Sequence, residues 1–168
     1  VLDGGGVTPD IKMDPVDVPD LIGQLEAQNM IFKYVNSYQQ SHESIGDPQE
    51  FRFDDFEGFI QFLQTYGFVY HNPAYRKLDE AVAVMEKDRQ SDYLPQLQQL
   101  QNELTQNNDA VFNADKEIIL KTIASQIIAR YYPEKDKILY KLRHDNEVKK
   151  AIEVLEDANG YQQILAGK

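Results

Sequence analysis

The chain of 168 residues contains no cysteine, and this absence removes several kinds of chemistry. Without a thiol there is no disulfide, no thiolate metal site and no cysteine nucleophile. A cysteine-free domain tolerates oxidising and reducing surroundings alike, so its compartment is not fixed by this absence.

Basic residues and long apolar runs are scarce as well. The chain has 17 Lys and Arg against 28 Asp and Glu, which gives a net charge of −11. Such a surface repels phosphate backbones and anionic lipid headgroups. No apolar stretch approaches the roughly 20 residues that span a bilayer, and the first residues do not form a signal peptide. We therefore expect no nucleic-acid partner and no membrane insertion.

Apolar residues are plentiful enough for a folded domain. They make up 42% of the chain and include 10 Tyr and 8 Phe, although Trp is absent. This content supports a real core and excludes wholesale disorder. The length fits one domain, or one domain with an extended tail.

Residues 1–16 differ from the rest of the chain. A run of three glycines, Gly4 to Gly6, indicates a turn, and Pro9 and Pro15 exclude a continuous helix. We expect this segment to be the end of a strand followed by a linker. It would be poorly packed in isolation or borrowed by a neighbouring molecule, because an edge strand without its sheet seeks pairing. The opening residues also resemble the middle of a longer chain, so we expect a fragment.

Helical periodicity begins near Asp17. One amphipathic helix is predicted from there to the Gly46-Asp47-Pro48 break. A second helix is predicted behind a capping box of Asp54 and Glu57, with Gly67 in the position of a C-terminal glycine cap.

Further helices are predicted after Asn72-Pro73, at Pro95 and after Asn113, and Pro133 ends the last of these. The helix after Asn113 has the widest apolar face, which places it centrally in the core. That face consists of Leu120, Ile123, Ala124, Ile127, Ile128 and Tyr131.

The last part of the chain is predicted to contain a brief extended stretch and two more helices. Apolar residues alternate over 138–142, Asp145 can cap the next helix, and Gly160 is expected to break it before a short closing helix. Together these patterns predict an all-α fold, an irregular bundle of six or seven helices preceded by a short extended N-terminal segment. No fixed-period repeat favours a solenoid.

The residues offer no complete catalytic or metal site. The glycine run lacks the ending of a P-loop, and the aspartates between Asp10 and Asp20 do not follow a calcium loop. His42, His71 and His144 lie far apart without metalloprotease or di-iron spacing. We expect surface roles for these histidines, and we predict no catalytic, cofactor-binding or metal residue and no cofactor.

The serines also lack the surroundings of a nucleophile. None lies in the glycine-lined turn that supplies an oxyanion hole. Ser125 lies in the most apolar helix and is expected to bond to its own backbone. An enzyme using carboxylates in a helical cleft remains a weaker alternative, which would require converging Asp or Glu side chains with raised pKa values.

Two parts of the sequence resemble a known family. Residues 4–11, Gly-Gly-Gly-Val-Thr-Pro-Asp-Ile, resemble a Gly-Ile-x-Pro-Asp-hydrophobic segment near the end of the protease core in C-terminal processing peptidases, also called tail-specific proteases. The helical extension of one branch of these enzymes is similar to residues 51–63, 128–132 and 145–165. The resemblance covers nearly the whole chain, and its N-terminal part is the more distinctive.

This resemblance implies a serine endopeptidase of the bacterial periplasm or cell envelope, which trims proteins from their C-termini with a Ser/Lys dyad. Its catalytic residues lie upstream of the Gly-Pro-Asp segment, and its PDZ module is absent here as well. Ser91 and Lys116 have a dyad-like spacing but lack the small-residue turn and the following glycines, so we interpret the spacing as coincidence. The parent would be an enzyme, and this chain would be inactive alone.

Two hypotheses follow. In the first, residues 1–16 are the end of the protease core and a linker, and residues 17–168 are a helical C-terminal domain that scaffolds, gates or dimerises the protease. Its partners would be the upstream protease core of the same polypeptide, a second copy of the chain, and the protein or peptide substrates of the parent enzyme. An apolar patch should then be exposed on the module. The alternative is an independent helical protein–protein interaction module with a groove for a partner segment.

Overall fold

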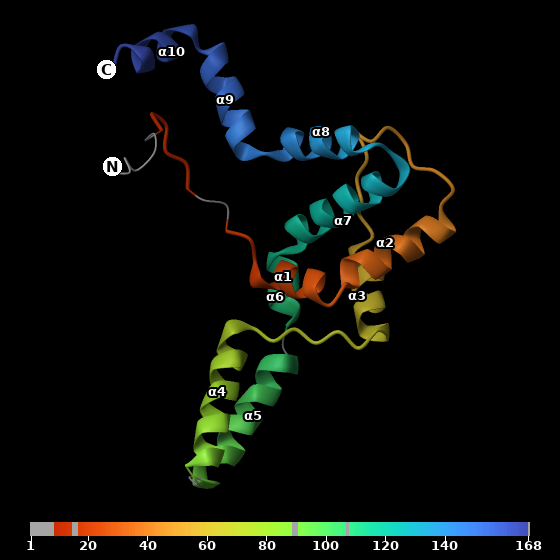
Figure 1. Cartoon of the computed structure of the whole chain (residues 1–168), viewed down its shortest axis with the longest axis vertical. Coiled ribbons are helices and arrows are strands. Elements are labelled where there is room, and N and C mark those ends of the chain that lie inside the picture. The colour runs from red at the N-terminus through yellow and green to blue at the C-terminus, as the bar shows by residue number, and fades with distance from the viewer. Residues whose placement is uncertain (1–8, 15–16, 89–90, 107, 168) are drawn as a thin grey trace, which may run out of the picture.

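The computed structural model describes residues 9–14, 17–88, 91–106 and 108–167 (Figure 1). These residues form helices and no strand, which confirms the all-α prediction. The elements are α1 (Asp20–Ala27), α2 (Met30–Ser41), α3 (Phe56–Thr65), α4 (Pro73–Lys87), the 3₁₀ turn η1 (Ser91–Tyr93), α5 (Leu94–Gln106), α6 (Asp109–Ala114), α7 (Lys116–Tyr131), α8 (Glu134–His144), α9 (Asn146–Glu156) and α10 (Ala158–Leu165).

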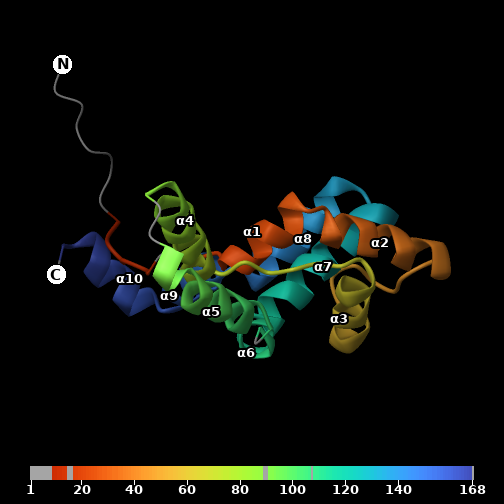
Figure 2. The ribbon, with the colours of Figure 1, turned by 90° about the horizontal axis from the view of Figure 1, so that it is seen from below.

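Helix α7 forms the centre of the core, as its wide apolar face predicted. It lies between α2 and α8, and Figure 2 shows these three helices gathered with α1. Ile119, Ile123 and Ile127 of α7 have no exposed surface. Around them pack Leu21 and Leu25 of α1, Ile31, Tyr34 and Val35 of α2, Phe56, Phe59 and Leu63 of α3, and Tyr140 of α8. The first three helices and α8 thus contribute their apolar residues to one core cluster, in which α7 packs mainly against α2 and α8.

Gly67 ends α3 as predicted. Its φ is +67°, a left-handed conformation that glycine adopts without a Cβ penalty. The Gly67 N–H donates to the Gln64 carbonyl at 3.1 Å, and the Phe68 N–H donates to the Leu63 carbonyl at 2.9 Å. This pair of bonds is a Schellman motif, and it turns the chain sharply into the connection to α4.

The predicted N-cap Asp145 is confirmed, the predicted N-cap Asp54 is displaced, and Asn72, after which a helix was predicted, also caps its helix. Asn72 accepts from the Tyr75 N–H at 2.8 Å, and Asp145 accepts from the Glu147 N–H at 2.7 Å. Asp54 was the wrong choice for α3, because Asp55 Oδ1 accepts from the Gly58 N–H at 2.9 Å. The cap thus lies one residue later than the sequence pattern indicated.

The predicted number of six or seven helices is too low for the described residues, which form ten α-helices. The first predicted helix is in fact α1 and α2. Asn29 between them has a φ of +58°, and asparagine is one of the few residues that tolerate this left-handed conformation. The short helix α6 was not recognised either. Of the predicted N-terminal segment, residues 9–14 are non-helical, and residues 1–8 and 15–16 lie outside the described residues.

Two local predictions near the C-terminus are wrong. Residues 138–142 belong to α8, where Tyr140 is buried while Ile138 and Leu142 are exposed on another face. Five alternating residues are too few to separate a strand from a helix. Gly160 does not break a helix but lies in α10, and its N–H donates to Asp157 Oδ1 at 3.0 Å. Asp157 is therefore the residue at which α9 ends and α10 begins.

The α4–α5 hairpin and the α9–α10 pair project from this core at opposite ends of the molecule (Figure 1). No residue of α4, α9 or α10 is buried. The chain exposes 12182 Å², whereas a compact monomer of 19.4 kDa is expected to expose about 8,500 Å². The fold thus has one compact centre and thinly packed projections.

Polar bonds fix the base of the hairpin to α1. Arg76 of α4 donates from both terminal nitrogens to the Asp20 carboxylate, at 3.0 and 2.9 Å. Gln24 also bonds to both backbone groups of His71, donating to its carbonyl at 2.7 Å and accepting from its N–H at 3.1 Å. These contacts set the direction in which the hairpin leaves the core.

We expect Ile123→Ala to lower the free energy of unfolding by about 2–5 kcal/mol, because it leaves a cavity against α2 and α8. The exposed residue Leu155 provides the control, and Leu155→Ala should change that free energy by less than about 0.5 kcal/mol. Urea denaturation of both variants measures the difference. An equal, small effect of the two substitutions would show that α7 is not the centre of the core.

The contact with Arg76 also predicts a pH dependence. The hydrogen bond from Arg76 lowers the pKa of Asp20, so the pair stabilises the fold above the ordinary carboxyl pKa. That contribution is lost as pH falls through the lowered pKa of the folded state. Arg76→Met should therefore reduce the free energy of unfolding at neutral pH, with a difference from wild type that shrinks below about pH 4.

Urea denaturation at several pH values measures this difference, with Lys87→Met as the control cation change on the same helix. The Lys87 variant should show no such convergence with wild type at low pH. A difference for Arg76→Met that stays constant down to about pH 2 would contradict the assigned pairing.

Candidate functional site

The three histidines singled out by the sequence lie apart, each beside a tyrosine four residues away on its own helix or at that helix's end. The ring of His42 stacks on Tyr38 with centroids 3.9 Å apart. His71 stacks on Tyr75 at 4.2 Å, and His144 lies 4.5 Å from Tyr140. Among the described residues, no group of three or more His, Cys, Asp or Glu side chains could hold a metal ion.

Ser91 and Lys116 belong to different parts of the fold. Ser91 begins η1 between the two helices of the hairpin, whereas Lys116 begins α7. The Lys116 ammonium lies 4.7 Å from the centre of the Phe56 ring. The lysine is therefore engaged with α3. That the chain has no catalytic residue of its own stays a prediction.

The prediction that Ser125 bonds to the backbone of its own helix is wrong. Its side chain is 4% exposed, and its hydroxyl has no hydrogen-bond partner within the described part of the chain. The carboxyls give no support to the weaker enzymatic alternative. Hydrogen bonds from Arg76 and Lys121 lower the pKa values of Asp20 and Glu117, the direction opposite to that required of a proton donor at neutral pH.

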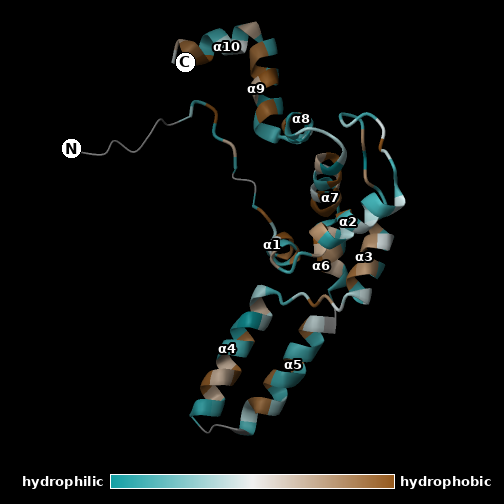
Figure 3. Cartoon of the chain, turned by 45° about the vertical axis from the view of Figure 1, so that its right-hand side comes forward, coloured by the Kyte–Doolittle hydropathy of each residue, from teal (hydrophilic) through white to brown (hydrophobic). Residues whose placement is uncertain are grey.

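An unusual amount of apolar surface lies on α8, α9 and α10, which we call the C-terminal arm (residues 134–165). Leu155 and Leu165 are 65% and 64% exposed. In Figure 3 hydrophobic residues recur along α9 and α10. The exposed large apolar residues of the arm are Ile138, Leu139, Leu142, Ile152, Leu155, Tyr161 and Leu165. The protease hypothesis requires exposed apolar residues of this kind.

The arm also differs in charge from the rest of the chain. Residues 134–165 contain six basic and seven acidic side chains, whereas residues 1–133 carry a net charge of −11. The arm can therefore approach another protein without the repulsion that the remaining surface would exert on an acidic partner.

The described start of the chain lies beside the arm. A groove of about 590 Å³ is bounded on one side by residues 9–13 and on the other by α9 and α10. Its apolar lining includes Ile11, Met13, Ala151 and Ile164. The N-terminal stretch thus reaches the core from the side of the molecule that carries α9 and α10 (Figure 1).

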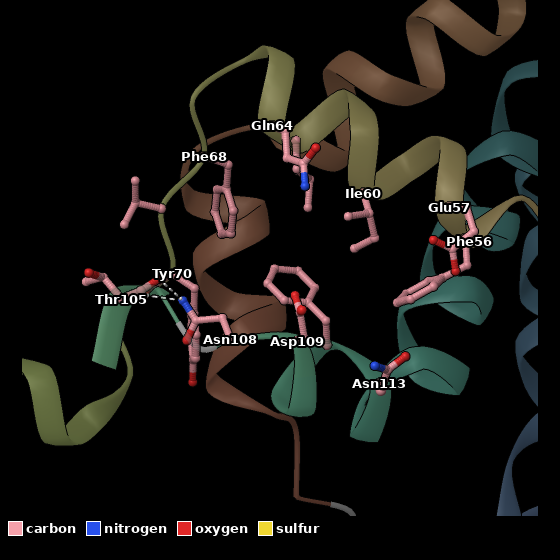
Figure 4. A pocket seen from close by; sticks show the side chains of 13 residues that line it. Phe56, Glu57, Ile60, Gln64, Phe68, Tyr70, Thr105, Asn108, Asp109 and Asn113 are labelled. Carbon is pink, nitrogen blue, oxygen red and sulfur yellow. Dashed lines mark hydrogen bonds between the residues drawn. The ribbon is translucent and has the colours of Figure 1, made fainter. Parts of the chain in front are cut away.

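A second concave feature lies between α3 and α6, and we call it the α3–α6 pocket (Figure 4). It has a volume of about 480 Å³ and is lined by Phe56, Ile60, Phe68 and Phe112 together with polar residues. Asn108 closes one end, where its Nδ2 donates to the carbonyls of Tyr70 and Thr105 at 3.3 and 3.0 Å.

Comparison with known families gives a match over most of this structure. The family described as "Probable PDZ-protease, C-terminal helical domain" matches residues 21–155. The chain belongs to this family. The match confirms the resemblance to the helical C-terminal segment of a processing protease. It runs from α1 into α9 and so includes the core, the hairpin and most of the C-terminal arm.

No curated protein and no solved structure matches the chain. Among its described residues, no helix has the length and apolar character needed to cross a membrane. The chain is thus a helical, protease-related domain.

Sequence reasoning did not find the α3–α6 pocket. Its lining comes from residues 56–70 and 105–113, which a long hairpin separates in the sequence. No motif links these two segments. Only the fold brings them together, because α6 follows the hairpin back to the core.

Proposed function

We propose that the chain is a non-catalytic domain of a C-terminal processing serine peptidase of the periplasm or cell envelope. In this proposal it docks on the protease core of its own polypeptide through the C-terminal arm and limits access to the protease cleft. The observation that carries the proposal is the exposed apolar surface of the arm, in a domain that belongs to a family of protease C-terminal domains.

The apolar residues of the arm follow a helical stripe. Val148, Ile152 and Leu155 of α9 are spaced i, i+4 and i+7, and the last two are 50% and 65% exposed. A helix with such a stripe normally buries it against a neighbouring element. Within the described residues, α9 packs mainly against α8 and α10 at its two ends, so its length is left open to a partner.

The position of residues 9–14 favours the protease core as that partner. A domain joined to the start of this stretch would lie next to α9 and α10, because the groove between them already places the two together. Docking would then need only a short connection, and a short connection gives a tethered partner a high effective concentration.

Such a domain can serve to limit access to the protease cleft. An unguarded protease would cut folded neighbours, whereas a narrowed entrance admits only loose chain ends. Scaffolding and dimerisation could use the same apolar surface. In a dimer, the arm of one chain would pack against the arm of a second copy. The binding experiment distinguishes dimerisation from docking on the protease core.

The direct test is binding between this chain and a separately expressed protease core from a polypeptide that carries the domain. The double variant Ile152→Glu and Leu155→Glu should weaken that binding at least about tenfold, because charge replaces the apolar centre of the contact. Val84→Glu is the matched control, since Val84 of α4 is 59% exposed and lies outside the arm. It should bind as wild type does.

The rate of cleavage of an unfolded substrate completes the test. We expect the wild-type chain to change the cleavage rate of the protease core. With the double variant, the rate should equal that of the protease core alone. If the protease core neither binds the chain nor changes its rate, the docking proposal is wrong and the independent interaction module is favoured. Self-association lost in the double variant, without protease binding, would instead assign the arm to dimerisation.

A further inference from the structure

We propose that the α3–α6 pocket binds an extended polypeptide segment in which a large apolar side chain is flanked by basic residues. The assignment of that segment to a substrate on its way to the protease rests on the function proposed above. The binding itself rests on three features of the pocket, which are the apolar residues in its mixed lining, the unpaired backbone N–H and C=O of Val69, and its charge.

The interior suits a single large apolar side chain. Phe56, which is 3% exposed, lines the pocket together with the partly buried residues Ile60, Phe68 and Phe112. Figure 4 shows Phe56, Ile60 and Phe68 on the side of α3 and the segment that follows it. The volume of about 480 Å³ falls within the usual range of ligand pockets. The pocket is bounded by α3, α6, Thr105 at the end of α5 and the connection between α3 and α4, and it is open to solvent.

The connection between α3 and α4 presents a free backbone edge at the pocket. Val69 is 46% exposed and lines the pocket, and its N–H and C=O make no hydrogen bond within the described residues. The residues on either side are fixed, because Phe68 donates to the Leu63 carbonyl and Tyr70 accepts from Asn108. The N–H and the C=O of Val69 belong to two successive peptide groups, and such unpaired groups in a fixed segment can bond to an extended chain, as in strand addition.

The charge around the pocket favours a basic segment. Glu57 and Asp109 line it, both residues are exposed, and neither forms an ion pair with a described cation. Residues 1–133, to which the pocket belongs, together carry a net charge of −11. Lysine or arginine beside the inserted side chain would lie near these carboxylates, and the field of the domain would steer such a segment towards them.

Fluorescence anisotropy with labelled peptides and the 168-residue chain tests the specificity. The probe is a short Gly-Ser peptide with the centre Lys-Lys-Phe-Lys-Lys, and it should bind. Replacing its Phe by Ser should weaken binding about tenfold or more, because the apolar burial is lost. Replacing the lysines by glutamates should abolish binding, and added salt should weaken the binding of the parent peptide.

Variants of the chain locate the binding. Gln64 is exposed at the pocket, so Gln64→Phe should fill the opening without disturbing the core and should weaken binding at least about tenfold. Gln61→Phe is the matched control, because Gln61 is exposed on the same helix but does not line the pocket. Its affinity should equal that of wild type.

Charge variants test the third feature. Glu57→Gln combined with Asp109→Asn should weaken binding about three- to tenfold at low salt, and the effect should shrink at high salt. Glu86→Gln on α4, an exposed residue that does not line the pocket, should leave the affinity unchanged.

The proposal is overturned if no probe peptide binds, if Phe and Ser peptides bind equally, or if Gln64→Phe binds as wild type does. None of these measurements requires the protease. Retained peptide binding without docking would therefore overturn the proposed function alone, and docking without peptide binding would overturn this inference alone.

Discussion

The structure depends on the burial of α7. Its isoleucines point to several sides of the helix, so no single neighbour can cover them, and Ile119, Ile123 and Ile127 are all fully buried. A helix that is apolar over most of its circumference is stable only inside a ring of other helices. The turn at Asn29 sets α1 and α2 against each other, α3 packs on α2, and α7 lies between α2 and α8.

The apolar residues of the first three helices pack in the core around α7. Few apolar contacts are therefore left to hold the two ends of the domain. The hairpin and the α9–α10 pair have almost no core of their own, yet α9 and α10 expose Ile152, Leu155 and Leu165. A surface of this kind is costly to leave in water and is typical of an interaction site. In the proposed function the compact centre is a rigid base and the nearly neutral arm contacts the protease. The α3–α6 pocket, with its carboxylates, contacts polypeptide.

Much of the fold could be predicted because its signals are local. Gly67 and Asp145 terminate or begin helices through bonds to residues two or three positions away, and the apolar face of α7 is contained in one segment. Asn29 was missed because the apolar stripe continues across it, and only its backbone conformation separates α1 from α2. The pocket could not be predicted, since Phe56 and Phe112 meet only after the chain has folded. The arm's stripe was visible in the sequence, but its exposure depends on which helices remain free to cover it.

The most direct measurement is amide hydrogen exchange of α9 and α10 in the chain alone and in its complex with the protease core. In the chain alone these amides should exchange by local opening, far faster than those of α7, because few contacts hold the arm. In the complex their exchange should slow markedly while that of α7 stays nearly the same. Exchange in α9 and α10 of the free chain that is as slow as in α7 would contradict the claim that the arm is a docking surface for the protease core. Exchange that the protease core leaves unchanged would contradict it as well.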